Sequence, residues 1–322
     1  MLDLFTPILQ RDKLHPNFLA TLAPHASGVR EVIKNWAKGF KDRDGKFVRE
    51  FQTTYNSSFW ELYLYAVLKE LKMEMDFSYS APDFVSKCGI VIEATVANHA
   101  QDDVPEWEKN IKTIGRENSF EVFRLSAIRL SNAFVAKVKK FQESYSHLNH
   151  VKDKPFIIAI SNYTRQDFNL HGDVPLQWLL YDVLEKETIL KSNGSKVNLG
   201  LFRSNAFEDV SAVLYSSLAT FGKARVLSRV NGDITCYAIR IKDNFTPIKI
   251  EENISNYNES LTDGLRLFVN PYARVPIDLS AFTNSDMRIF VSDKDGNLNI
   301  SCHKDGDLCM RYIKSVFPKK QL

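Results

Sequence analysis

Hydrophobic residues recur at intervals of three and four between residues 57 and 71, which is the spacing of an amphipathic helix. A second pattern of this kind runs from residue 128 to residue 141 and predicts another long helix. Shorter helices are expected near residues 29–40 and from Pro175, because proline is favoured in the first turn of a helix.

Short apolar runs of the kind that form buried strands lie between and after the two long helices. The strands are expected at residues 76–79, 82–85, 90–96 and 156–160. Residues 86–89 end in glycine and suit a tight turn between two of these strands. The predicted order is therefore helix, three strands, helix, strand, within a core of about residues 50–165.

Beyond residue 222 the pattern changes to short runs with strand character. Asn231-Gly232 and Asp295-Gly296 are sequences typical of the tight turns of β-hairpins, and the first hairpin is expected to begin with a strand at residues 224–230. We therefore expect an α/β domain at residues 1–222 and a β-rich C-terminal subdomain at residues 223–322.

The composition is that of a globular protein with one or two domains. The chain has 322 residues, of which 44% are hydrophobic and 25% are charged, so disorder, collagen and a coiled coil are excluded as descriptions of the whole. Its four cysteines form no C-x-x-C pair, so neither a zinc ribbon nor a disulfide framework is predicted. Because the sequence shows no leader pattern and no run that could span a bilayer, we expect a cytoplasmic protein with no membrane partner.

The net charge of +3 conceals a change of sign along the chain. Residues 74–108 contain eight acidic residues and one lysine, a net charge of −7. Residues 109–154 contain ten basic and four acidic residues, a net charge of +6. A segment that could hold a cation therefore precedes one that could bind phosphate, although such charge runs are usually solvated surfaces.

Glu93 interrupts the apolar run at residues 90–96. A carboxylate buried there must be paired, protonated or bound to a metal, because an unpaired buried charge is costly. The turn at residues 86–89 is expected to bring Asp83 close to Glu93, and two carboxylates with a backbone carbonyl suit Mg²⁺ or Mn²⁺. Such a cation supports phosphodiester hydrolysis. A structural salt bridge from Glu93, for instance to Arg129, is the alternative.

The chain resembles the PD-(D/E)XK nuclease superfamily, in particular its uncharacterised bacterial members. The resemblance rests on Glu61 in the first long helix, on Pro82-Asp83, and on Glu93-Ala94-Thr95 in a hydrophobic strand. It covers about a third of the chain and implies an α/β fold with a restriction-endonuclease-like αβββαβ core, whose central mixed sheet is flanked by helices. The β-rich C-terminal part is then an appendage to this core.

The resemblance also implies an activity. It implies a divalent-metal-dependent endonuclease, with Mg²⁺ or Mn²⁺ as cofactor and the phosphodiester bonds of DNA, or of RNA, as substrate. Restriction or anti-phage defence is implied by analogy alone. Cutting both strands of a duplex calls for two active sites, which indicates a homodimer.

Thr95 departs from the superfamily pattern, which has a lysine two residues after the second acid. Either the site is inactive or a lysine reaches it from elsewhere, and the candidates are Lys87 at the hairpin and Lys137 on the basic helix. Lys137 is preferred, because it shares a helix edge with apolar residues and could point inward. The residues expected to contact phosphate or solvent instead are Arg129, Lys139 and Lys140.

The predicted active site therefore consists of Asp83 and Glu93 as metal ligands, Glu61 as a third acid, and Lys137 as a catalytic lysine. Two alternatives stay open. A catalytically inactive module of the same fold, which binds nucleic acid or protein, would explain Thr95. A hydrolase that uses Glu61 and Glu93 as an acid and base pair without metal is the other.

Overall fold

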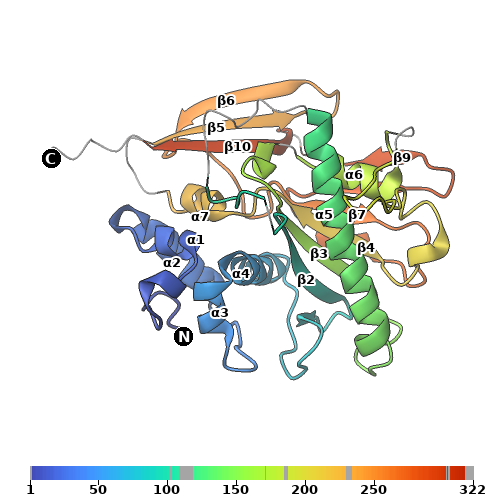
Figure 1. The fold of residues 1–322 in the computed structure, drawn as a ribbon, viewed down its shortest axis with the longest axis horizontal. Coiled ribbons are helices and arrows are strands. Elements are labelled where there is room, and N and C mark those ends of the chain that lie inside the picture. The colour runs from blue at the N-terminus through green and yellow to red at the C-terminus, as the bar shows by residue number, and fades with distance from the viewer. Residues whose placement is uncertain are drawn as a thin grey trace.

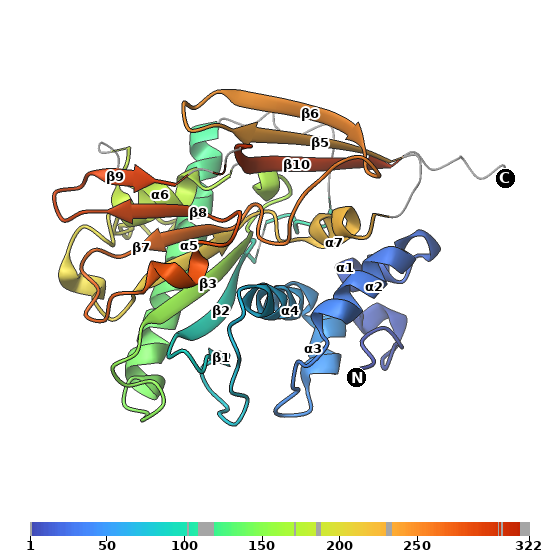
Figure 2. The same cartoon turned by 180° about the vertical axis from the view of Figure 1, so that it is seen from behind.

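The structure is a computed structural model that describes residues 2–101, 103–108, 119–170, 172–184, 188–229, 234–301, 303 and 305–315. A seven-stranded mixed sheet lies at its centre with helices on both faces, and a three-stranded sheet lies along one end of it (Figures 1 and 2). The helices are α1 (Pro16–Thr21), α2 (Ser27–Trp36), α3 (Phe47–Thr53), α4 (Tyr55–Glu70), α5 (Ser119–Lys140), α6 (Val174–Tyr181) and α7 (Phe221–Leu227).

The strand order of the central sheet is β1-β2-β3-β4-β7-β8-β9. Its strands are β1 (Phe84–Val85), β2 (Val91–Asn98), β3 (Phe156–Tyr163), β4 (Ala212–Ser216), β7 (Arg266–Val269), β8 (Arg288–Ser292) and β9 (Leu298–Ile300). Strands β2, β3 and β4 are parallel neighbours, whereas β1 is antiparallel to β2, and β7 is antiparallel to β4 but parallel to β8. Helices α5 and α6 provide the two connections between the parallel strands, as such connections require.

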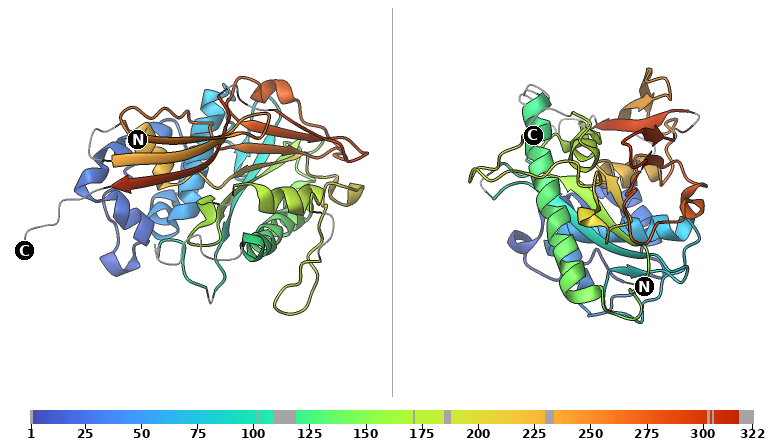
Figure 3. Two further views of the ribbon diagram at one scale, coloured as in Figure 1. Left: turned by 90° about the horizontal axis from the view of Figure 1, so that it is seen from above. Right: turned by 90° about the vertical axis from the view of Figure 1, so that its right-hand side faces the viewer.

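Helices α5 and α6 cover one face of the sheet, and α4 covers the other. Figure 3 shows α5 running alongside the sheet as the outermost element of its layer. The indole of Trp60 on α4 is fully buried and donates a hydrogen bond to the carbonyl of Ala159 on β3, at 3.1 Å. Helices α2 and α3 pack on the outer side of α4, so that α4 is buried on nearly all sides.

Several predicted elements are confirmed. The pattern at residues 57–71 forms α4, that at residues 128–141 lies largely within α5, and the run at residues 90–96 lies within β2. Strands β8 and β9 pair as the hairpin expected around Asp295-Gly296. The turn at residues 86–89 is also present, and Gly89 adopts a φ of 94°, which favours glycine.

The prediction of a strand at residues 76–79 is wrong. The Asp76 carboxylate accepts hydrogen bonds from the Ser78 amide at 2.9 Å and from the Ser78 hydroxyl at 2.6 Å, which turns the chain locally. Only an isolated bridge between Met75 and Ser86 continues the sheet on this side. The order of elements in this part of the chain is therefore α4, β1, β2, α5 and β3. The first of the three expected strands is reduced to a bridge.

The division into domains at residue 222 does not match the sheet. Strand β7 pairs with β4 across that position, and β8 and β9 extend the same central sheet. The strand expected at residues 224–230 is largely helix α7, whose Thr220 hydroxyl caps the Gly222 amide at 3.2 Å. The turn predicted at Asn231-Gly232 lies outside the described residues.

The second sheet has the strand order β10-β5-β6. Its strands are β5 (Ile234–Ile241), β6 (Pro247–Asn253) and β10 (Asp307–Ser315). A buried ion pair joins it to the central sheet, since Arg288 on β8 lies 3.2 Å from the Asp307 carboxylate on β10. In the described part of the chain, no helix has both the length and the apolar character needed to cross a membrane.

Candidate active site

Glu93 and Asp83 lie beside each other at the edge of the central sheet. The β1–β2 register pairs Phe84 with Ile92, which places Asp83 opposite Glu93 and on the same face of the sheet. The Ala94 amide donates a hydrogen bond to Asp83 Oδ2 at 2.7 Å and fixes this carboxylate against β2. The two acids, ten positions apart in the sequence, therefore share one site.

Two lysines of α5 reach Glu93. Lys137 Nζ lies 2.7 Å and Lys140 Nζ lies 2.9 Å from Glu93 Oε1. Glu93 is only 1% exposed, whereas Lys137 is 20% and Lys140 is 49% exposed, so the ammonium groups stand between the buried acid and solvent. Burial disfavours the charged form of Lys140, but hydrogen bonds to Tyr145 and Glu93 outweigh it and raise its pKa.

The second oxygen of Glu93 is the unusual atom of the site. Glu93 Oε2 is buried and has no hydrogen-bond partner among the described residues. A buried carboxylate oxygen normally accepts a hydrogen bond or binds a cation, because the loss of hydration is otherwise uncompensated. The two lysines therefore bind only one of the two oxygens of this carboxylate.

Burial and mutual repulsion favour the protonated form of the neighbouring acids. Burial, reinforced by the charge of Glu93, raises the pKa of Asp83 to about 6. Burial, followed by the charge of Asp83, raises the pKa of Glu61 to about 8. Glu61 projects from α4, on the opposite side of the sheet from α5, and no base among the described residues lies within ion-pair distance of it. The site thus concentrates negative charge, which the two lysines of α5 offset in part and protonation of Asp83 and Glu61 reduces further.

The remaining predicted residues lie differently from expectation. Lys140 does not point away from the acids but bonds to Glu93, because residues 137 and 140 are three apart and share a helix face. Arg129 forms no ion pair with Glu93; its guanidinium donates to the carbonyls of Asn98 at 2.8 Å and His99 at 3.1 Å. Phosphate contacts of these two residues stay a prediction.

Lys139 and Thr95 do not contact the two acids through a charged group. Lys139 is exposed and lies 3.7 Å from Glu143 on the same helix, so it does not contact the acids. Thr95 is on β2, two residues after Glu93 and on the same face. Lys137 and Lys140 together bring amino groups to the acids from α5, whereas Thr95 offers none.

The donor set fits a hard divalent cation. Mg²⁺ and Mn²⁺ prefer oxygen ligands, and one or two carboxylates with several waters commonly suffice for Mg²⁺. Asp83 and the orphaned Glu93 Oε2 supply such oxygens. Within the described ranges, no three aspartate, glutamate, histidine or cysteine side chains converge as a ready metal cage. The fit therefore rests on Asp83 and Glu93, and Glu61 adds a third carboxyl group whose pKa responds to the charge of Asp83.

Comparisons with known proteins add little to this geometry. No family model matches the chain, and no solved structure matches it. The chain is similar to a DNA polymerase from Kluyveromyces lactis, with 25% identity over 150 residues. This similarity covers 42% of the present chain but only 14% of the polymerase.

Proposed function

We propose that the chain is a divalent-metal-dependent nuclease of the PD-(D/E)XK type, which hydrolyses phosphodiester bonds of DNA. The observation that carries this proposal is the buried Glu93, with Oε1 bonded to two lysines and Oε2 without a partner. A buried carboxylate oxygen normally has a hydrogen-bond partner or a bound cation, so Glu93 Oε2 offers a ligand position for a metal. The similarity to part of a DNA polymerase is in keeping with a nucleic-acid substrate.

Each residue of the site has a role in this proposal. Asp83 and Glu93 Oε2 would hold a divalent cation, which would supply Lewis acidity at the scissile phosphate. The Ala94 amide keeps Asp83 in place. Lys137 and Lys140 bring positive charge to the mouth of the site, where a phosphate would approach. Glu61, with its raised pKa, holds a proton near neutral pH and so limits repulsion between the acids.

The test is cleavage of supercoiled plasmid, linear duplex DNA, single-stranded DNA and RNA in Mg²⁺, in Mn²⁺ and in EDTA. We expect cleavage of DNA only with a cation, and a loss of at least about 100-fold in Asp83→Asn and in Glu93→Gln. Lys139→Ala is the matched control, because this lysine lies on the same helix but pairs with Glu143. Equal cleavage by the wild type and both carboxylate variants would contradict the proposal. Undiminished cleavage in EDTA would favour the metal-free pair of Glu61 and Glu93.

The second candidate function is a non-catalytic module of the same fold. Thr95 in place of the usual lysine favours it, together with the engagement of both site lysines by Glu93. This reading predicts DNA binding that weakens with salt and no turnover with any cation. Binding measured at low and high salt, alongside the cleavage assay, separates the two functions.

A further inference from the structure

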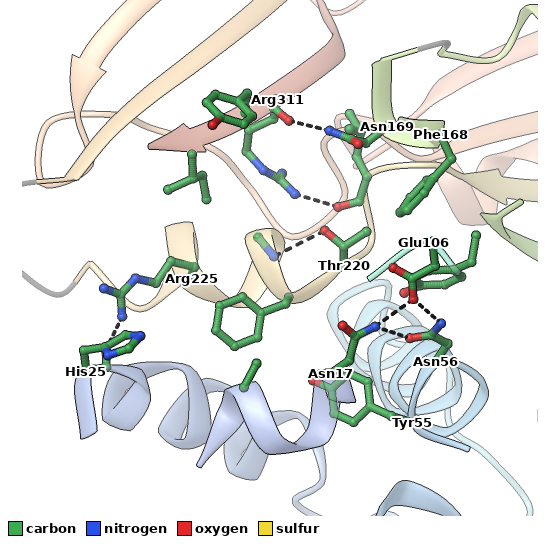
Figure 4. A pocket seen from close by; sticks show the side chains of 17 residues that line it. Asn17, His25, Tyr55, Asn56, Glu106, Phe168, Asn169, Thr220, Arg225 and Arg311 are labelled. Atoms are coloured by element: carbon green, nitrogen blue, oxygen red, sulfur yellow. Dashed lines mark hydrogen bonds between the residues drawn. The ribbon is translucent and has the colours of Figure 1, made fainter. Parts of the chain in front are cut away.

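A cavity of about 350 Å³ lies at the other end of the parallel strands from Asp83 and Glu93 (Figure 4). Tyr163 at the end of β3, Leu218 just after β4, and Glu106 after β2 all line it. In open α/β sheets, ligands characteristically bind outside the carboxyl ends of the parallel strands. Helices α1 and α4 and strand β10 close the other sides of the cavity. Two further lining residues, Ala20 and Tyr312, are exposed, and Tyr312 has 45% of its surface accessible.

One end of the cavity carries a fixed carboxylate. Glu106 is 3% exposed, and its Oε1 accepts hydrogen bonds from the side-chain amides of Asn17 at 2.8 Å and Asn56 at 2.7 Å. Asn17 also donates to Asn56 Oδ1 at 2.9 Å, so the three side chains hold one another (Figure 4). Tyr55 lines the same end, and its hydroxyl is buried with no hydrogen-bond partner in the described chain. This end is therefore a preorganised polar surface with an unused hydroxyl.

The other end carries a buried positive charge without a counter-charge. Arg225 on α7 is only 6% exposed, and its guanidinium donates to the carbonyl of His25. Among the described residues, no carboxylate lies within ion-pair distance of it, and burial alone lowers its pKa. Arg311 nearby differs, since its charge is paired with Glu259. A buried guanidinium that lacks a carboxylate partner is costly for the fold and is the group best suited to bind an anion.

Aromatic side chains form part of the cavity wall. Phe168 and Phe221 also line the cavity, and Phe168 lies on the side of Glu106, whereas Arg225 lies on the opposite side of the view in Figure 4. Its volume of about 350 Å³ is near the lower limit for ligand pockets, roughly 300–1,000 Å³. This size suits one nucleotide rather than a dinucleotide cofactor. Aromatic walls favour a planar ring, because any of the bases can stack on an aromatic side chain.

We propose that this cavity binds a single nucleotide unit, with its phosphate at Arg225 and its base toward Glu106. An ionised carboxylate accepts hydrogen bonds only, so it favours bases that present an exocyclic amino group, namely adenine, guanine and cytosine, over uracil and thymine. The unit is either a free mononucleotide or the terminal nucleotide of a strand. The proposal does not depend on nuclease activity, because none of the residues that line the cavity belongs to the Asp83 and Glu93 site.

The test is equilibrium binding by calorimetry in EDTA, so that cleavage cannot contribute. The probes are guanosine, GMP, CMP, UMP, inorganic phosphate, and a four-residue DNA strand with or without a 5′-phosphate. We expect saturable binding of GMP or CMP that is at least about 10-fold tighter than that of UMP and of inorganic phosphate. Tighter binding of the short strand than of any mononucleotide assigns the terminal nucleotide as the ligand, whereas equal or weaker binding assigns the free mononucleotide.

Two variants test the two ends of the cavity separately. Arg225→Met is expected to weaken GMP binding about 10- to 100-fold, down to the level of guanosine, without loss of thermal stability, because it removes an uncompensated charge. Glu106→Gln is expected to reduce the preference for GMP or CMP over UMP. Arg203→Met, an exposed arginine that does not line the cavity, is the control. Absence of binding to every probe, or GMP binding that is unchanged in Arg225→Met, overturns the proposal.

Discussion

Replacing Glu61 with glutamine should remove a large pH dependence of folding stability. Burial and the charge of Asp83 raise the pKa of Glu61 from 4.5 to about 8. At about 1.4 kcal/mol per pKa unit, this difference corresponds to about 5 kcal/mol between the fully protonated and fully ionised limits. Glu61 is only partly shielded from water, so solvent screening reduces the expected effect to about 2–4 kcal/mol.

The sign follows from the raised pKa. The folded protein binds the Glu61 proton more tightly than the unfolded chain does, so the stabilisation is fully present below about pH 4.5 and is lost as the pH rises through about 8. Glu61→Gln cannot ionise and should keep its stability over this window. At pH 8.5 the variant should therefore be more stable than the wild type, and at pH 4.5 the two should be nearly equal.

The assay is urea unfolding in EDTA at four pH values from 4.5 to 8.5, with the difference between variant and wild type plotted against pH. Glu143→Gln is the matched control, because Glu143 is exposed beside Lys139 and should give no pH-dependent difference. Parallel curves for Glu61→Gln and the wild type would refute the reasoning. In Mg²⁺ the wild type should regain stability at pH 8.5, because a bound cation favours ionised carboxylates.

Three further outcomes are expected. Lys137→Ala should lower the free energy of unfolding, measured in urea, by about 1–3 kcal/mol, since it removes one of the two donors to the buried Glu93. The control variant Lys139→Ala should show no change in the same assay. The double variant Lys137→Ala with Lys140→Ala should cost about 3–5 kcal/mol in the same assay, because it leaves a buried charge unpaired. Burial, with a smaller contribution from a neighbouring histidine, lowers the pKa of His15 from 6.5 to about 4. Stability should therefore fall as the pH drops from about 6.5 to 4, and a flat profile after subtraction of His15→Asn data would contradict this.

Local pattern was sufficient for the long elements and for the two main acids. The spacing of three and four that predicts α4 and α5 is set by burial against the sheet, and the predicted turn at residues 86–89 sets the register that brings Asp83 opposite Glu93. The same helical spacing could have placed Lys140 beside Lys137, since positions three apart share a face. The prediction of a strand at residues 224–230 was wrong because a short apolar run fits a buried helix as well as a strand.

The nucleotide cavity had no sequence signal at all. Its polar ends come from Asn17, Asn56, Glu106 and Arg225, which only the tertiary fold brings together. An arginine in a seven-residue helix gives no sign of lacking a counter-charge until the surrounding carboxylates have been placed. Spacing rules act over a few residues, whereas these contacts depend on how the sheet orders its strands.

The geometry of β2 also separates the two proposals. Glu93 is near the start of this strand, and Asn98 at its end is five residues farther, about 17 Å at 3.3 Å per residue. The cavity lies beyond that end and shares no lining residue with the acid site. Substitutions this far apart, with no common partner, act additively. Loss of cleavage in Asp83→Asn should thus leave GMP binding intact, and loss of GMP binding in Arg225→Met should leave the pH dependence of Glu61 intact, so neither result can be mistaken for the other.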